Sequence, residues 1–176
     1  MSGVRAAVIG HVEWVDFVRV ERMPARGDIV HAQSAWSAPA GGGSVAAVQL
    51  AKLASGCTFL TALGDDDLGR RAFDELTAMG VRVEAAFRRA PTRRAITHIE
   101  PGGERTITVL GDRLSPSASD PLPWDELKDA DAVYVCACDA AALTLARRAH
   151  ALVATSRIIM PTLREAGVRL DGVVGS

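Results

Sequence analysis

The sequence predicts an α/β fold built on a doubly wound, mostly parallel sheet. Short apolar segments alternate with helical segments through most of the 176-residue chain, and this alternation is typical of parallel strands joined by helices. Two pairs of more polar strands, at about residues 12–36 and 95–110, interrupt the rhythm. We therefore expect one domain over residues 1–176, with helices on both faces of a main sheet and a small separate β-lid.

The chain begins with a buried strand followed by the first hairpin. Ala6–Gly10 is a short apolar run that ends in glycine, as a buried strand does. Val12–Val20 carries interspersed charges, which favours a more exposed strand. The segment from Pro24 to Asp28 has the composition of a turn, so Ile29–Trp36 is expected to return alongside.

The rest of the chain alternates helices, strands and one more hairpin. We expect helices at residues 45–54, 70–79, 124–128, 140–150 and 161–166. We expect strands at residues 57–63, 81–87, 132–138, 152–155 and 171–175. The second hairpin pairs Ala95–Glu100 with Arg105–Leu110 around the turn-forming Pro-Gly-Gly-Glu segment.

Composition excludes several classes of protein. Hydrophobic residues make up 48% of the chain and charged residues 23%, which is typical of a folded globular domain. The net charge of −1 gives no reason to expect nucleic acid or a membrane surface as a partner. No secretory signal or long apolar span is visible, and three cysteines cannot all pair. We expect a cytoplasmic protein with reduced thiols.

The run Gly41, Gly42 and Gly43 before a helix is the most informative local feature. Glycines let backbone N–H groups approach a ligand, and the start of a helix favours electron-rich groups. The same run could equally be a plain connection between a strand and a helix. It is neither a Walker A loop nor a dinucleotide fingerprint, because the spacing of both is missing.

Two other clusters have structural interpretations. The carboxylates of residues 65–67 are expected to cap the following helix rather than bind a metal, since no calcium-loop glutamate follows. Cys136 and Cys138 face the same side of a predicted strand without two further ligands, so buried thiols are expected there. No hydrolase motif is present, and we assign no catalytic residue and no metal ligand.

Two acidic residues are candidates for substrate binding. Asp16 follows the first strand, and Asp139 lies at the carboxyl end of a later one, where ligands bind in open α/β sheets. A carboxylate accepts hydrogen bonds from sugar hydroxyls through two oxygens. An ordinary solvated acid is an equally good interpretation of each residue taken alone.

Taken in order, these segments resemble the amino-terminal half of the PfkB (ribokinase-like) carbohydrate kinase family. The specific similarities extend from about Val4 to Leu110. They comprise Val8-Ile9-Gly10 with a following Asp16, Pro24-Ala25-Arg26-Gly27-Asp28, the glycine run, Leu63-Gly64-Asp65-Asp66-Asp67-Leu68-Gly69, the Leu76-to-Val81 segment and Gly102-Gly103-Glu104-Arg105-Thr106. Two positions depart from the family pattern. Val45 or Ala46 replaces its asparagine, and Glu13-Trp14-Val15-Asp16 replaces Asn-x-Asp, so ribose cannot simply be assumed as substrate.

The resemblance implies a three-layer α/β/α fold with a β-lid that closes over a sugar or nucleoside and often forms a homodimer interface. It implies phosphoryl transfer from ATP, with Mg²⁺, to a substrate hydroxyl. By resemblance, Asp16, Gly41, Gly42, Gly43 and Asp139 would bind the substrate.

The family's Gly-Ala-Gly-Asp motif has no match in this chain. The fold is therefore expected to be truncated, with no strong binding of ATP or Mg²⁺ and no phosphoryl transfer by these residues alone. A non-catalytic sugar-binding or dimerisation module, or an inactive remnant, is the alternative. An unrelated nucleotide-binding α/β protein explains the two hairpins less well.

Overall fold

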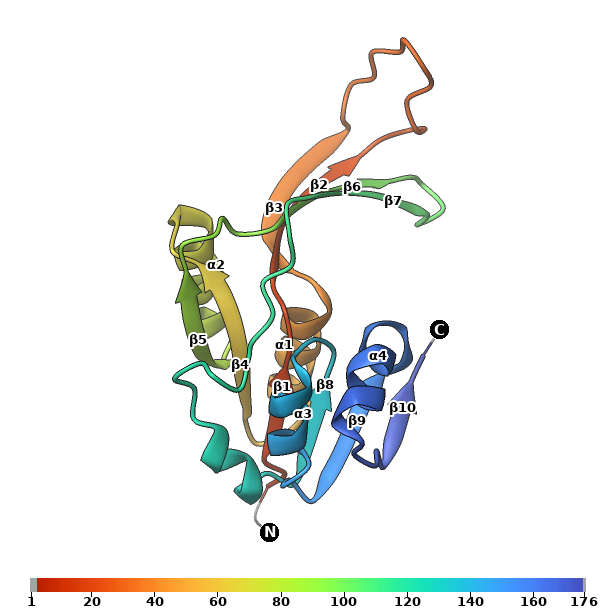
Figure 1. The fold of residues 1–176 in the computed structure, drawn as a ribbon. Helices are drawn as coiled ribbons and strands as arrows, with labels where there is room; N and C mark the ends of the chain where they lie inside the picture. Colours follow the sequence, from red (N-terminus) through yellow and green to blue (C-terminus); the bar gives the residue numbers. More distant parts are fainter. Residues whose placement is uncertain (1–2, 176) are drawn as a thin grey trace.

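The main sheet forms the centre of the molecule (Figure 1). The computed structural model describes residues 3–175, of which residues 157–159 are described by their backbone alone. The six strands are parallel, in the order β10-β9-β8-β1-β4-β5. They are β1 (Ala6–Ile9), β4 (Cys57–Gly64), β5 (Arg82–Arg88), β8 (Ala132–Val135), β9 (Ala151–Thr155) and β10 (Gly172–Val174). The predicted parallel sheet is confirmed.

Helices cover both faces of this sheet and bury two apolar clusters. Helices α1 (Gly42–Leu53) and α2 (Asp67–Ala78) pack on one face. The short helix η1 (Trp124–Asp129), α3 (Ala140–Ala146) and α4 (Ser156–Ala166) pack on the other. In β1, Val8 points to the first layer while Ala7 and Ile9 point to the second. This alternation explains why the strand is apolar throughout, and it confirms the three layers.

The two predicted hairpins join into one small sheet, which we call the lid sheet. Its strands are β2 (Glu13–Arg19), β3 (Ser34–Ala40), β6 (Arg94–Ile99) and β7 (Arg105–Leu110), in the order β3-β2-β6-β7. The central pair, β2 and β6, is parallel, and the outer pairs are antiparallel. The lid sheet projects beyond the carboxyl ends of the main strands (Figure 1), so it overhangs the edge at which α/β proteins bind ligands.

Strand β3 begins later than the sequence indicates. The predicted strand was Ile29–Trp36, whereas the structure has Ser34–Ala40. The register places Phe17 opposite Trp36, and their rings stack with centroids 5.2 Å apart. Pro39 then lies within the strand, which is tolerated because β3 is an edge strand whose outer side needs no N–H donor.

Helix α1 also differs from its prediction, because it begins at Gly42 rather than Val45. The glycines therefore form the first turn of the helix instead of a loop before it. The helix predicted over residues 140–150 ends at Ala146, and the strand predicted over residues 132–138 ends at Val135. None of the helices of residues 3–175 is both long and apolar enough to cross a bilayer.

Candidate functional site

The start of α1 lies directly against the loop that follows β1. A Cβ atom added to Gly43 would stand 2.8 Å from the carbonyl oxygen of His11, and one added to Gly10 would stand 2.9 Å from the Cα of Gly43. Gly41 has a φ of 94°, which side-chain-bearing residues rarely adopt. Gly43 is therefore required by this close backbone approach and Gly41 by its backbone conformation, and together they bring the helix start to the ligand-binding edge of the sheet.

A cavity of about 470 Å³ separates this helix start from the lid sheet. Its volume lies within the range of small-molecule sites. The lid sheet, α1 and β8 each contribute lining side chains, so the cavity depends on the tertiary arrangement. The residues that line it are Glu13, Val15, Phe17, Ala40, Gly41, Gly42, Val45, Ala46, Gln49, Thr97, Arg105, Ile107 and Tyr134.

Two side chains, those of His11 and Arg93, lie beside the carboxylate of Glu13, which lines the cavity. One carboxylate oxygen of Glu13 lies 3.6 Å from Nε2 of the buried His11 and 3.2 Å from Nη1 of Arg93. The neighbouring His11 side chain lowers the pKa of Glu13, burial opposes this effect, and the charge of Arg93 adds to it. Glu13 is therefore held as a carboxylate, which accepts hydrogen bonds from hydroxyl groups.

Asp16 lies on the opposite face of the lid sheet from this cavity. Side chains alternate along β2, and Glu13, Val15 and Phe17 are the ones that line the cavity. Asp16 instead accepts hydrogen bonds from Ser37 Oγ at 2.6 Å and Arg94 Nη2 at 2.9 Å, both of which lower its pKa. Substrate binding by Asp16 stays a prediction that this placement does not support.

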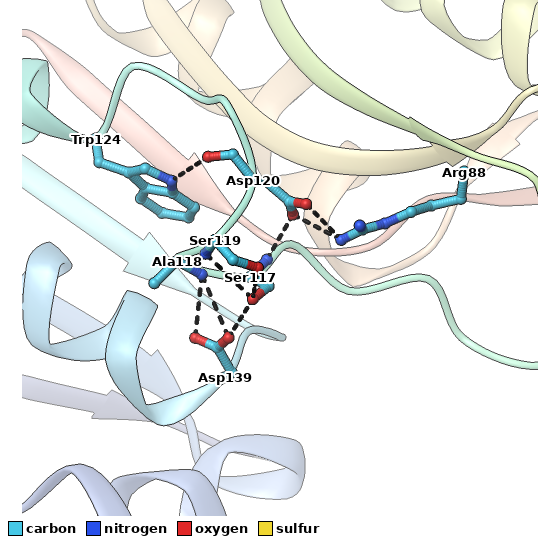
Figure 2. A network of polar contacts seen from close by, with 7 residues as sticks. All are labelled: Arg88, Ser117, Ala118, Ser119, Asp120, Trp124 and Asp139. Atoms are coloured by element: carbon cyan, nitrogen blue, oxygen red, sulfur yellow. Dashed lines mark hydrogen bonds and ion pairs between the residues drawn. The ribbon is translucent and has the colours of Figure 1, made fainter.

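Asp139 is engaged in a network that holds the segment after the lid sheet (Figure 2). It caps α3 by accepting from the backbone N–H of Ala142 at 2.7 Å, and it also accepts from Ser117 Oγ and the N–H of Ala118. Burial raises the pKa of Asp139, but hydrogen bonds from Ser117, Ala142 and Ala118 outweigh it, and the net pKa is lowered.

The network continues to the edge of the main sheet through Asp120. Its buried carboxylate accepts from the N–H of Ser117 at 2.7 Å and lies 2.6 Å from Nη2 of Arg88 (Figure 2). Its backbone oxygen accepts from Nε1 of Trp124 at 3.1 Å. These contacts fix the segment that connects the lid sheet to the main sheet. Asp139 is outside the cavity lining, so its assignment as a substrate ligand stays a prediction.

The acidic triplet has the structural role that its spacing predicts. Asp66 caps α2 by accepting from the N–H of Gly69 at 2.8 Å. The same carboxylate accepts from the N–H and the hydroxyl of Thr92, at 2.7 and 2.6 Å, so it also fixes the segment that enters the lid sheet. The capping prediction is confirmed.

The three cysteines are buried, free thiols. Burial raises the pKa of Cys136 to about 11 and that of Cys57 and Cys138 to about 12. The prediction that Cys136 and Cys138 act as small buried groups is confirmed. Among the described residues, no three His, Cys, Asp or Glu side chains gather closely enough to hold a metal ion. We assign no step to a Mg²⁺ ion among these residues.

The sequence singled out the glycine run but missed the rest of the cavity. Glu13 and Arg93 are 80 positions apart by number, and only the pairing of β2 with β6 brings their neighbourhoods together. A signal for Glu13 was present, because alternation along β2 puts Glu13 and Val15 on one face and Asp16 on the other.

Comparison with known proteins supports the resemblance. The sequence profile described as "pfkB family carbohydrate kinase" matches residues 5–169. A ribokinase of Dictyostelium discoideum is 26% identical over 106 residues, covering 59% of this chain and 33% of the relative. An ATP-dependent ribose-1-phosphate kinase of Halopiger xanaduensis is 31% identical over 136 residues, covering 75% and 45%. The chain thus spans less than half the length of these curated relatives.

Solved structures agree on the fold. Ribokinase of Arabidopsis thaliana, complexed with ribose and ATP, matches with a TM-score of 0.70 at 18% identity, covering 99% of this chain and 60% of that one. Ribokinase of Giardia lamblia matches with a TM-score of 0.73 at 18% identity, covering 88% and 55%. These similarities establish a ribokinase-like fold and show that this chain corresponds to part of it.

Proposed function

Since the chain belongs to the pfkB family of carbohydrate kinases, we propose that it forms the sugar- or nucleoside-binding part of an ATP-dependent kinase. The observation that carries this proposal is the cavity between the lid sheet and the glycine start of α1. Such a kinase would transfer the terminal phosphoryl group of ATP to a substrate hydroxyl, with Mg²⁺ as its metal ion.

The residues around the cavity suit a polyhydroxylated ring. N–H groups at the start of α1 have no side-chain cap, and Gly41 and Gly42 leave them accessible to hydroxyl oxygens. The Glu13 carboxylate can accept from hydroxyl groups on the other side. Val15, Phe17 and Ile107 would cover the apolar face of the ring and exclude water when the lid sheet closes.

We propose that residues other than these 176 carry out phosphoryl transfer. The sequence contains no Gly-Ala-Gly-Asp segment and no Gly-Lys-Ser/Thr loop to hold phosphates. We therefore assign none of these residues to the nucleotide. We propose that the chain alone binds substrate without turnover.

A ligand panel tests this proposal. We expect ribose, fructose or adenosine at millimolar concentration to raise the melting temperature of the purified chain, because a ligand that binds only the folded state stabilises it. An ADP-release assay on the same samples should show no turnover. The absence of any melting shift across the panel would count against substrate binding, and robust ADP release would contradict the assignment of phosphoryl transfer to other residues.

Dimerisation through the lid sheet is a second candidate role. Every residue of the edge strand β7 is exposed, and Ile107, Val109 and Leu110 leave 52%, 41% and 41% of their surfaces accessible. Exposed apolar edge strands readily pair with another chain. We propose that two copies associate through β7, and sedimentation of Ile107→Lys against wild type would test it. A wild-type chain that sediments as a monomer at 100 µM would contradict this role.

A cytoplasmic location also belongs to this proposal. It is supported by the three buried free thiols, which suit a reducing compartment.

A further inference from the structure

A second cavity lies at the end of the main sheet opposite the lid sheet. Its volume is about 460 Å³, close to that of the cavity under the lid sheet. Ala6, Cys57 and Arg82, which are the first residues of β1, β4 and β5, all line it. The cavity is therefore at the amino ends of these parallel strands, whereas the lid sheet projects beyond their carboxyl ends (Figure 1). The function proposed above assigns it no ligand.

The inner wall of this second cavity is apolar and uncharged. Ala7 on β1, Leu60 on β4 and Leu127 on η1 line it, and all three are almost fully buried members of one apolar cluster. Cys57 also lines it, and burial raises the pKa of this thiol to about 12, so the thiol is neutral at neutral pH. Such a wall favours the transfer of a hydrocarbon group out of water.

An ion pair joins two walls of the cavity. Arg82 on β5 donates two hydrogen bonds to the carboxylate of Glu126 on η1, at 2.7 and 3.1 Å, and a third to Glu84 at 2.9 Å. This forked geometry is the strong form of an arginine–carboxylate contact. Arg82 and Glu126 both line the cavity, but because each is the partner of the other, neither is available to an ionic group of a ligand.

The two other ionic residues that line the cavity, Arg5 and Asp129, are exposed and have free hydrogen-bonding capacity. Within residues 3–175, the only ion pair of Arg5 joins its Nε atom to Asp131 at 3.8 Å, which leaves both terminal nitrogens of the guanidinium without an acceptor. On η1, the ion pairs of the described residues involve Asp125 and Glu126, and none involves Asp129. A guanidinium suits a ligand carboxylate, and a carboxylate accepts hydrogen bonds from a ligand ammonium.

We propose that this second cavity binds an α-amino acid with an apolar side chain. The side chain lies against the wall that contains Leu60 and Leu127, the carboxylate contacts Arg5, and the ammonium contacts Asp129. A ligand with a single charge leaves one of these two residues without a partner, so it is the weaker match. This inference goes beyond the proposed function, since it concerns the opposite end of the sheet from the sugar cavity.

Calorimetric titration of the 176-residue chain tests this proposal with four probes. They are L-phenylalanine, 3-phenylpropionate, which lacks the ammonium, 2-phenylethylamine, which lacks the carboxylate, and glycine, which lacks the apolar side chain. We expect phenylalanine to bind at least about fivefold more tightly than each of the other three, because each of them loses one charge-assisted contact or the buried ring.

Two substitutions assign the two charges to their residues. Arg5→Gln should weaken the binding of phenylalanine and 3-phenylpropionate by at least about fivefold and leave 2-phenylethylamine unchanged. Asp129→Asn should weaken phenylalanine and 2-phenylethylamine by a similar factor and leave 3-phenylpropionate unchanged. Both residues are exposed, so both variants should keep the circular dichroism spectrum of the wild type.

Asp125→Asn is the matched control. It makes the same change on the same short helix, but Asp125 pairs with Arg148 and lies outside the cavity lining. It should leave the affinities of all four probes unchanged, and a loss equal to that of Asp129→Asn would overturn the assignment. Phenylalanine that does not bind, or that binds no more tightly than glycine or either single-charge analogue, would also overturn it. The sugar-induced rise in melting temperature tests the proposed function separately from all of these outcomes.

Discussion

The main sheet and the lid sheet use apolar residues in opposite ways. In the main sheet, Phe59 and Leu60 on β4 face opposite layers and are fully buried. In the lid sheet, Ile107 and Val109 are as apolar but remain about half exposed. Helices of the same chain cover the apolar side chains of the main sheet. The lid sheet instead presents its apolar side chains to the cavity and to solvent. The difference separates residues that hold the fold together from residues available for binding.

The largest expected loss of stability comes from a substitution in the core of the main sheet. Phe59→Ala should lower the free energy of unfolding by about 3–5 kcal/mol, because it removes a fully buried ring and leaves a cavity. Ile107→Ala on the lid sheet should change it by less than about 0.5 kcal/mol. Urea denaturation followed by circular dichroism measures both, and similar costs for the two variants would contradict the comparison.

Two glycines, Gly43 at the start of α1 and Gly102 in the lid hairpin, are expected to differ in how well they tolerate a side chain. Gly43→Ala places a methyl group 2.8 Å from the His11 carbonyl oxygen, so it should destabilise the chain by about 1–3 kcal/mol and shift α1 away from the cavity. Gly102→Ala, in the lid hairpin, meets no atom within 4 Å and should be nearly neutral. A stable Gly43→Ala variant with unchanged sugar binding would show that close approach is not required.

Asp139 caps α3 and also holds the segment that follows the lid sheet. Replacing it is expected to have a smaller effect on stability. Asp139→Ala should cost about 1 kcal/mol, while Asp139→Asn keeps the cap and should cost less. The folded-state pKa of Asp139 is lowered, so its ionisation stabilises the fold above the unfolded pKa near 4. This contribution is lost as pH falls through the lower folded-state pKa. Urea denaturation between pH 3 and 7 should show less acid sensitivity in Asp139→Asn, and unchanged sensitivity would contradict the assignment.

The smallest expected effect concerns Asp16. Because it points away from the cavity, Asp16→Asn should change sugar affinity by less than about twofold. Calorimetric titration with the panel ligand that raises the melting temperature most measures this directly. A tenfold loss would restore the sequence-based prediction that Asp16 binds substrate.

The sequence predicted the architecture well because periodicity and turn residues record local burial. The apolar run of β1, the cap at Asp66 and the glycine run all left readable patterns. The site was predicted less completely, because it is assembled by pairing across the lid sheet. Asp16 was selected by position after a strand, and only the register of β2 shows that Glu13 faces the cavity instead.

The boundary of β3 was missed for a related reason. Pro39 and the preceding small residues indicate a loop, and only an edge position allows them to form a strand. The stacking of Phe17 on Trp36, which fixes the register, joins residues on two different strands and has no local signature.

The central claim is that sugar binds in the cavity between α1 and the lid sheet. The most direct test fills that cavity. Val45→Trp enlarges a half-exposed side chain that lines it, and Leu53→Trp makes the same kind of change at the exposed far end of the same helix. We expect both variants to fold. Val45→Trp should lose the sugar-induced rise in melting temperature, and Leu53→Trp should retain it. A Val45→Trp variant that responds to sugar as wild type does would contradict the account.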